Sequence, residues 1–229
     1  SDLADRNQWV EDEFVQQSRT PTVATKANNA AVTTPDALDF FRRGVEKLNR
    51  GDDRAAIEDF NQALRLNPHF AEAYSHRGTI RHDKGDYHGA IQDYNQVLRI
   101  YPQHAETYSN RGMARATLGD RWGAIQDFNQ ALEIDANCAQ AYLNRGHARM
   151  ELEDFAGAIA DCNAVLSIHP NRVNNAIVTG LQALAFLNRG YARMQLEDYP
   201  GAIADFNQTL QMNPDLAEAY FNRGLSQAL

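Results

Sequence analysis

The sequence predicts an all-α fold built from stacked helix pairs, and three observations predict it. The dipeptide Arg-Gly stands at six regularly spaced positions, from Arg43-Gly44 to Arg223-Gly224, at intervals of 34, 34, 34, 44 and 34 residues. A string of the type AIxDFNQAL follows each of the first five occurrences. Each period also has a break near its middle that carries Asp, and in most periods a Pro near its end. One short helix pair cannot bury its own apolar face, so several pairs must stack.

These anchors divide the chain into an acidic leader, residues 1–36, and a repeat domain, residues 37–229. The repeats are placed at 37–70, 71–104, 105–138, 139–172 and 183–216, with an insert at 173–182 and a partial repeat at 217–229.

Each repeat is expected to hold two helices. In the second repeat, good helix formers run from Ala71 to about Lys84, and Gly85 then breaks the helix. A second helix follows from about His88 and ends before Pro102, which cannot continue a helix interior. An Asp stands at the same turn position in all five repeats, where its side chain suits an N-cap: Asp52, Asp86, Asp120, Asp154 and Asp198.

Two segments break the period. In the leader, Leu3, Val10 and Phe14 fall on one face of a short amphipathic helix with Trp9 beside them, and residues 18–36 read as a tether. We predict that Trp9 and Phe14 form an arm that docks into a groove.

The insert should lengthen the first helix of the fifth repeat by about three turns. Its apolar residues Ile177, Val178 and Leu181 then need a cover, which is either the fourth repeat or another chain, a partner or a second copy.

The recurring residues resemble the tetratricopeptide repeat (TPR) family. Its pattern has an aromatic residue at position 4, small residues at positions 8 and 20, an aromatic residue at 24 and Pro at 32. Here Gly fills every position 8 and Ala every position 20, and the departures are Cys162 at position 24 and Ala136 at position 32. The resemblance implies a right-handed superhelical solenoid of antiparallel helix pairs, with a concave groove lined by the first helices. The NRG and AIxDFNQAL strings resemble bacterial, notably cyanobacterial, members.

Arg at position 7 and Asp at position 23 recur together, at nearly the same level of the helix pair. We interpret them as an ion-pair ladder that fixes the register of the stack. The alternative is a row of arginines that grips an acidic ligand. The ladder pairs named here are Arg77 with Asp93, Arg111 with Asp127, and Arg145 with Asp161.

In the resembled family, positions 2, 5, 9, 12 and 13 of each first helix line the groove. The candidate partner-binding residues at such positions are Phe41, Val45, Thr79, His82, Met113, Leu143, His147, Met150, Leu187, Tyr191, Met194, Phe221 and Leu225. Phe41 and Val45 stand where chaperone-binding members carry Lys and Asn, so a carboxylate clamp is not expected. The apolar C-terminal half predicts an apolar-anchored peptide or helix as ligand. The alternative is that some of these residues pack against the neighbouring repeat.

Composition and motifs argue against other classes. The formal charge is −8, which disfavours nucleic acid as a partner, and no apolar run is long enough for a membrane span. Cys138 and Cys162 lack metal or disulfide spacing. His76, His82 and His88 are spaced by six residues, which puts His76 and His82 well apart around a helix axis, and we interpret them as solvated positions. Phosphate loops, GxSxG and HExxH do not occur. The sequence therefore predicts no catalytic residues, no metal and no cofactor.

The predicted function is a non-catalytic protein–protein interaction scaffold, such as an adaptor or assembly factor. The alternative is a self-associating structural protein that forms a homodimer or larger homo-oligomer through the insert, the leader or the terminal helix. No secretory signal is visible at residues 1–30, which favours the cytoplasm, although residues before Ser1 are not part of this sequence.

Overall fold

A computed structural model describes residues 36–168 and 175–229, with side chains from residue 179 onward in the second range. The described residues form eleven α-helices and no strand. The all-α fold class is therefore confirmed. The helices are α2 (Ala37–Asn49), α3 (Asp53–Leu66), α4 (Ala71–Asp83), α5 (Tyr87–Ile100), α6 (Ala105–Thr117), α7 (Arg121–Ile134), α8 (Ala139–Met150), α9 (Phe155–Ser167), α10 (Asn175–Gln195), α11 (Tyr199–Met212) and α12 (Ala217–Ala228).

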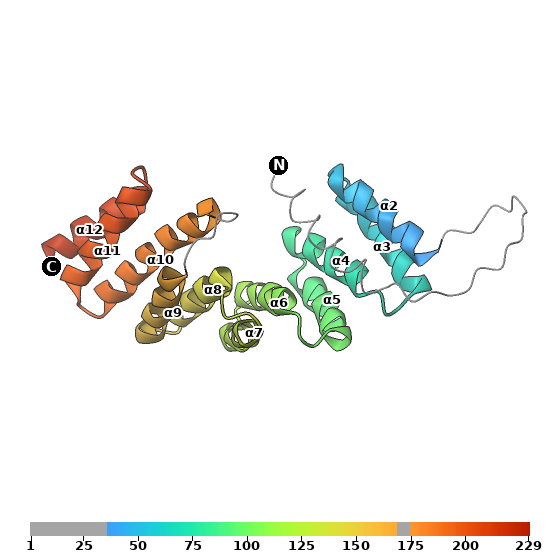
Figure 1. The fold of residues 1–229 in the computed structure, drawn as a ribbon, viewed down its shortest axis with the longest axis horizontal. Coiled ribbons are helices and arrows are strands. Elements are labelled where there is room, and N and C mark those ends of the chain that lie inside the picture. The colour runs from blue at the N-terminus through green and yellow to red at the C-terminus, as the bar shows by residue number, and fades with distance from the viewer. Residues whose placement is uncertain (1–35, 169–174) are drawn as a thin grey trace, which may run out of the picture. The chain divides into compact units, whose positions relative to one another are not determined.

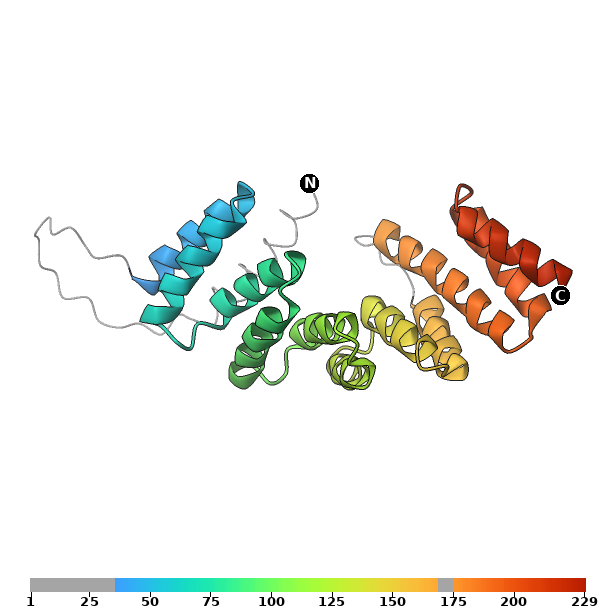
Figure 2. The same cartoon turned by 180° about the vertical axis from the view of Figure 1, so that it is seen from behind.

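Even-numbered helices are the first helices of the repeats and odd-numbered helices are the second (Figure 1). The predicted arm residues Trp9 and Phe14, and the side chains of Ile177 and Val178, lie outside the described residues. The chain divides into two compact units, Ser1–Ile80 and Arg81–Leu229, here called the N-terminal and C-terminal units. In the C-terminal unit, the two helices of a repeat pack against each other, and each second helix also contacts the next first helix (Figure 2).

The turn between the two helices of a repeat is built from two recurring residues. The five predicted Asp residues accept hydrogen bonds from backbone N–H groups at the start of the second helices; Asp154, for example, accepts from Gly157 N at 2.9 Å. These side chains satisfy donors that the helix itself leaves unpaired. The preceding residue has a positive φ, and it is Gly in the first three repeats but Glu153 and Glu197 in the last two.

Close approach of the two helices depends on Gly at position 8. A Cβ atom added at Gly112 would lie 2.7 Å from the ring of Phe128. One added at Gly190 would lie 2.8 Å from the ring of Phe206. Only a residue without a side chain fits against these rings. In the fourth repeat Cys162 replaces the ring, and a Cβ at Gly146 would meet its nearest neighbour at 3.4 Å.

The insert lengthens α10 to 21 residues, against 13 in α6 and 12 in α8; the extension is a little over two turns, where the sequence predicted about three. Leu181 packs against a buried cluster of the fourth repeat that includes Leu143 and Val165. Gln182 Nε2 donates to the Ile168 carbonyl at 3.0 Å. Of the two covers considered for the insert, the fourth repeat is the one that Leu181 contacts.

Candidate functional site

A continuous face of the C-terminal unit is formed by its first helices. Helix α6 contacts α8, α8 contacts α10, and α10 contacts α12. On each helix, positions 2, 9 and 13 lie within about 20° of one direction around the axis, because seven and eleven residues are close to whole numbers of turns. We call these side chains the first-helix stripe. Its members are Glu106, Met113, Thr117, Gln140, His147, Glu151, Leu184, Tyr191, Gln195, Glu218, Leu225 and Leu229.

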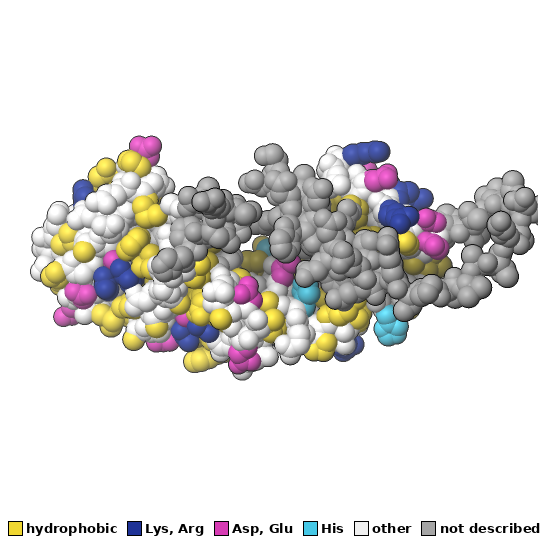
Figure 3. Space-filling view, in the orientation of Figure 1, with side chains coloured by type: hydrophobic (Ala, Val, Ile, Leu, Met, Phe, Trp, Pro, Cys, Tyr) yellow, Lys and Arg dark blue, Asp and Glu magenta, His cyan; other side chains and the backbone are white. Residues whose placement is uncertain are grey.

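The stripe is open to solvent along its length. Met113 is half-buried and every other member is exposed. Its apolar members gather on the last two first helices, where Leu184 is 48% exposed and Tyr191 and Leu225 are each 40% exposed. In Figure 3 the hydrophobic side chains over α10, α11 and α12 form several separate patches among polar atoms. The stripe thus offers a few apolar contact points on a mostly polar face.

Positions 5 and 12 lie about 60–80° to one side of the stripe and are packed. Leu143 and Leu187 at position 5 are 5% and 7% exposed, and Met194 at position 12 is 9% exposed. All three belong to hydrophobic clusters of the C-terminal unit. The prediction that these three residues line an open groove was therefore wrong, and the alternative of packing against neighbouring helices holds for them. Met150 is half-buried, and Phe221, at position 5 of α12, is 70% exposed.

In the N-terminal unit the predicted groove residues are also packed. Phe41 lies against Phe60, Phe70 and His76, with ring centroids 5.8, 4.8 and 5.4 Å away, and Val45 packs on the same cluster. His76 stacks on Phe60 at 5.6 Å, and its burial lowers its pKa to about 4. The expectation that His76 is a solvated position was wrong.

The two remaining candidates near the boundary between the units have local partners. Thr79 is exposed and its hydroxyl donates to the Ser75 carbonyl at 3.1 Å. His82 is half-buried and packs edge-on against Tyr87, with centroids 5.2 Å apart.

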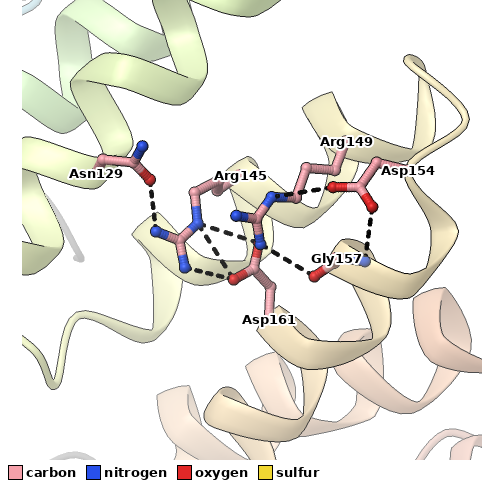
Figure 4. A network of polar contacts seen from close by, with 6 residues as sticks. All are labelled: Asn129, Arg145, Arg149, Asp154, Gly157 and Asp161. Carbon is pink, nitrogen blue, oxygen red and sulfur yellow. Dashed lines mark hydrogen bonds and ion pairs between the residues drawn. The ribbon is translucent and has the colours of Figure 1, made fainter.

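A buried carboxylate lies at the centre of each repeat of the C-terminal unit. In the fourth repeat, Asp161 accepts hydrogen bonds from Nε of Arg145 at 3.1 Å and from Nη1 of Arg149 at 2.8 Å (Figure 4). Arg149 also donates to the Gly157 carbonyl at 3.1 Å and pairs with the capping Asp154 at 3.6 Å. The same arrangement surrounds Asp127, with Arg111 and Arg115, and Asp205, with Arg189 and Arg193.

The position-7 arginine also reaches the preceding repeat. Arg145 Nη1 donates to Asn129 Oδ1 at 2.6 Å, and Arg111 bonds Asn95 in the same way at 2.6 Å. Each position-7 guanidinium lies 4.8–5.4 Å from the centroid of the position-4 ring of its own helix. The side chain therefore joins two repeats while its flat face rests on an aromatic ring.

The N-terminal unit has a related centre. Asp59 is bonded by Arg43 and Lys47, and hydrogen bonds from Arg43, helped by Lys47, hold the pKa of Asp59 below its usual value. Arg77 in this unit bonds Asn61, and Asp93 in the C-terminal unit accepts from Arg81 at 2.8 Å.

The Arg–Asp pairs were predicted from the sequence, but the second arginine, at position 11, and the Asn at position 25 were not. Both recur with the 34-residue period, so the repetition was the signal that could have found them. In the C-terminal unit, the guanidinium groups of Arg111, Arg145 and Arg189 are bonded to both Asp and Asn side chains. This arrangement argues against the alternative in which the arginine row grips an acidic ligand.

Neither a metal cluster nor a membrane-spanning helix is present in the described part of the chain. Across residues 36–168 and 175–229, no three His, Cys, Asp or Glu residues come together in a way that could hold a metal ion. No helix in these ranges is both long and apolar enough to cross a membrane.

Comparison with known proteins shows the family. A tetratricopeptide repeat model matches residues 41–105 and 110–173, and a TPR repeat model matches residues 190–229. Together the matches cover more than half of the chain, so the chain belongs to the tetratricopeptide repeat family. Over 38 residues, 17% of this chain, it is 40% identical to the uncharacterized protein MJ0572 of Methanocaldococcus jannaschii, and it covers 44% of that relative's length.

Solved structures show the same fold. A MamA crystal structure matches with a TM-score of 0.68 and 19% identity, over 80% of this chain and 94% of that chain. MamA from Desulfovibrio magneticus RS-1 matches with a TM-score of 0.68 and 16% identity, over 79% and 97%. YrrB, described as a TPR protein with an unusual peptide-binding site, matches with a TM-score of 0.69 and 19% identity, over 82% and 92%.

Proposed function

We propose that this chain is a non-catalytic protein-interaction scaffold that binds a peptide or helix of a partner protein along the first-helix stripe. The observation that carries the proposal is the division within each first helix of the C-terminal unit. Positions 5 and 12 pack inward on α8 and α10, whereas positions 2, 9 and 13, apart from half-buried Met113, stay exposed on the four first helices α6, α8, α10 and α12. A face that contributes little to the core is available for a ligand.

The dimensions of the stripe suit a short segment. Packed helices lie about 8–10 Å apart, so four of them extend over roughly 30 Å. That length accommodates about nine residues of extended peptide or about 20 residues of helix. The apolar side chains on α10 and α12 supply the anchors, and Tyr191 has the size and amphipathic character common at binding hot spots.

The likeness to YrrB supports a peptide as the ligand class, since that TPR protein is described as having a peptide-binding site. A scaffold that grips a segment of one protein and leaves its other faces free serves as an adaptor or assembly factor. We extend the proposal to such a role.

Selection of phage-displayed random 16-residue peptides on the full chain tests the proposal. We expect enriched peptides to bind the Tyr191→Glu variant at least about tenfold more weakly than the wild type, because the charge disrupts the apolar contact points. The matched control is Trp122→Glu, which places the same charge at a side chain that is 69% exposed on the second helix α7. This control should bind normally.

Three outcomes would count against the proposal. One is the absence of any enriched peptide, and another is equal binding to wild type and Tyr191→Glu. The third is a concentration-dependent dimer, seen by light scattering, that Tyr191→Glu abolishes; it would assign the stripe to self-association instead.

A further inference from the structure

The charged side chains of the first-helix stripe are all acidic. Glu106 stands at position 2 of α6 and Glu218 at position 2 of α12, and both are exposed. Neither has an ion-pair partner within the described ranges of the chain. The third, Glu151, pairs with Arg121 at 3.1 Å and is therefore partly neutralised.

The cations of the same helices are committed elsewhere. Arg111 and Arg115 bond Asp127, and the equivalent pairs on α8 and α10 bond Asp161 and Asp205. On α12, Arg223 bonds Asn207 at 2.8 Å and lies over its own position-4 ring. No Lys or Arg occupies a stripe position. The arginines of the first helices are thus engaged within the polar network, and the charged groups that a ligand on the stripe would meet are carboxylates.

The order of chemical types along the stripe is also defined. In the order of the first helices, α10 with apolar Leu184 and Tyr191 stands between α12, which carries Glu218 and Leu225, and α8, which carries polar Gln140 and His147. Glu106 follows on α6. A ligand with apolar anchors would therefore have a carboxylate of the stripe near each end.

From this arrangement we infer that the ligand is a cationic segment, in which Lys or Arg residues flank two or three apolar anchors. The inference rests on the proposed function and specifies its ligand class. An acidic segment or a free C-terminal carboxylate would meet Glu106 and Glu218 with no basic side chain of the stripe to offset the repulsion. The formal charge of −8 adds a long-range attraction for a cationic partner.

The test uses the same random 16-residue peptide library on the full chain, at low and at high salt. Peptides that depend on the stripe, because the charge-neutral variant Tyr191→Ala loses them, should carry more Lys and Arg than the input library. A double variant, Glu106→Lys with Glu218→Lys, should weaken their binding about tenfold at 50 mM NaCl and much less at 500 mM. The charge-matched control, Glu58→Lys with Glu133→Lys, changes two exposed residues of second helices and should leave affinity within about twofold.

The outcomes separate the two claims. Stripe-dependent peptides that are acidic or match the input charge would overturn the cationic ligand while the proposed function stands. Equal weakening by the double variant and its control would mean that net charge alone causes the loss of binding. That result would also overturn the cationic ligand. If no peptide depends on Tyr191, the proposed function itself fails.

Discussion

The third repeat, α6 and α7, and the fourth, α8 and α9, hold the same polar network around different cores. In the third, Arg111 Nε and Arg115 Nη1 each bond Asp127 at 2.9 Å. In the fourth, the corresponding bonds to Asp161 are 3.1 and 2.8 Å. Yet the buried position 24 beside the network is Phe128 in one repeat and Cys162 in the other.

The difference teaches that a repeat relies on two separable devices. The carboxylate and its arginines fix how the helices are aligned, and they form whether or not a ring fills the neighbouring space. The aromatic ring sets how tightly position 8 is confined. A Cβ atom added there would lie 2.7 Å from the Phe128 ring in the third repeat, but 3.4 Å from its nearest neighbour in the fourth. Substitutions in the two repeats can therefore test each device by itself.

The largest effect is expected from removing the buried carboxylate. Asp127→Ala and Asp161→Ala should each lower the free energy of unfolding by roughly 3–5 kcal/mol, because two arginines lose their shared partner. Urea denaturation followed by far-ultraviolet circular dichroism measures both losses. They should agree within about 1 kcal/mol, as the network is the shared device.

Glu133→Ala, a change at an exposed residue of α7, serves as the control and should change stability by less than about 0.5 kcal/mol. A loss near that value for either Asp variant would show that the network does not hold the repeats together.

The second effect depends on the ring. Gly112→Ala should cost roughly 1–3 kcal/mol, because the new methyl group collides with Phe128. Gly146→Ala should instead stabilise the chain by about 0.5–1 kcal/mol, since the methyl group fits and Ala favours the helix. Thermal unfolding of the two variants should shift in opposite directions, and Gly190→Ala, which faces Phe206, should follow Gly112→Ala. The same direction of shift for Gly112→Ala and Gly146→Ala would break the comparison.

Much of this architecture is predictable from the sequence because the repeat reports each local choice several times. The turn Asp residues act as caps, and the helices of the second repeat end within about one residue of their expected bounds. The position-8 residues Gly44, Gly112 and Gly190 each face an aromatic ring. The family and the all-α fold followed from these local patterns.

The burial of individual side chains was harder to predict. Leu143 and Tyr191 are both apolar-bodied residues at groove positions of the family, yet one is in the core and the other is exposed. Which side of a first helix packs depends on the direction in which the next helix lies, and that direction is not encoded in a single helix. Asn129 likewise meets Arg145 only because two repeats stack, so its role requires the three-dimensional arrangement.

A smaller effect concerns the two thiols. Cys162 is buried and its burial raises the pKa of the thiol to about 12, whereas Cys138 is half-buried. At pH 8 in the native state, Ellman's reagent should therefore react with Cys162 at least about tenfold more slowly than with Cys138. A Cys138→Ser variant isolates the Cys162 rate. Equal rates for both thiols would mean that the fourth repeat, which lacks the ring, opens locally far more easily than its network implies.

The smallest effect lies in the turn that joins the two helices of each repeat. Gly119 in the third repeat has a φ of +87°, and Glu153 takes the same left-handed conformation in the fourth with a φ of 61°. In this conformation a residue with a Cβ is destabilised by about 1 kcal/mol or more relative to Gly. The greater conformational freedom of Gly in the unfolded chain offsets part of that advantage. Glu153→Gly should therefore stabilise the chain by about 0.5 kcal/mol, and Gly119→Glu should destabilise it by about 1 kcal/mol. Glu197→Gly provides an independent copy of the first change. If the Glu153 and Gly119 variants shift the urea midpoint in the same direction, the turn conformation is not what distinguishes the two repeats here, and contacts of the Glu153 side chain must hold it in place.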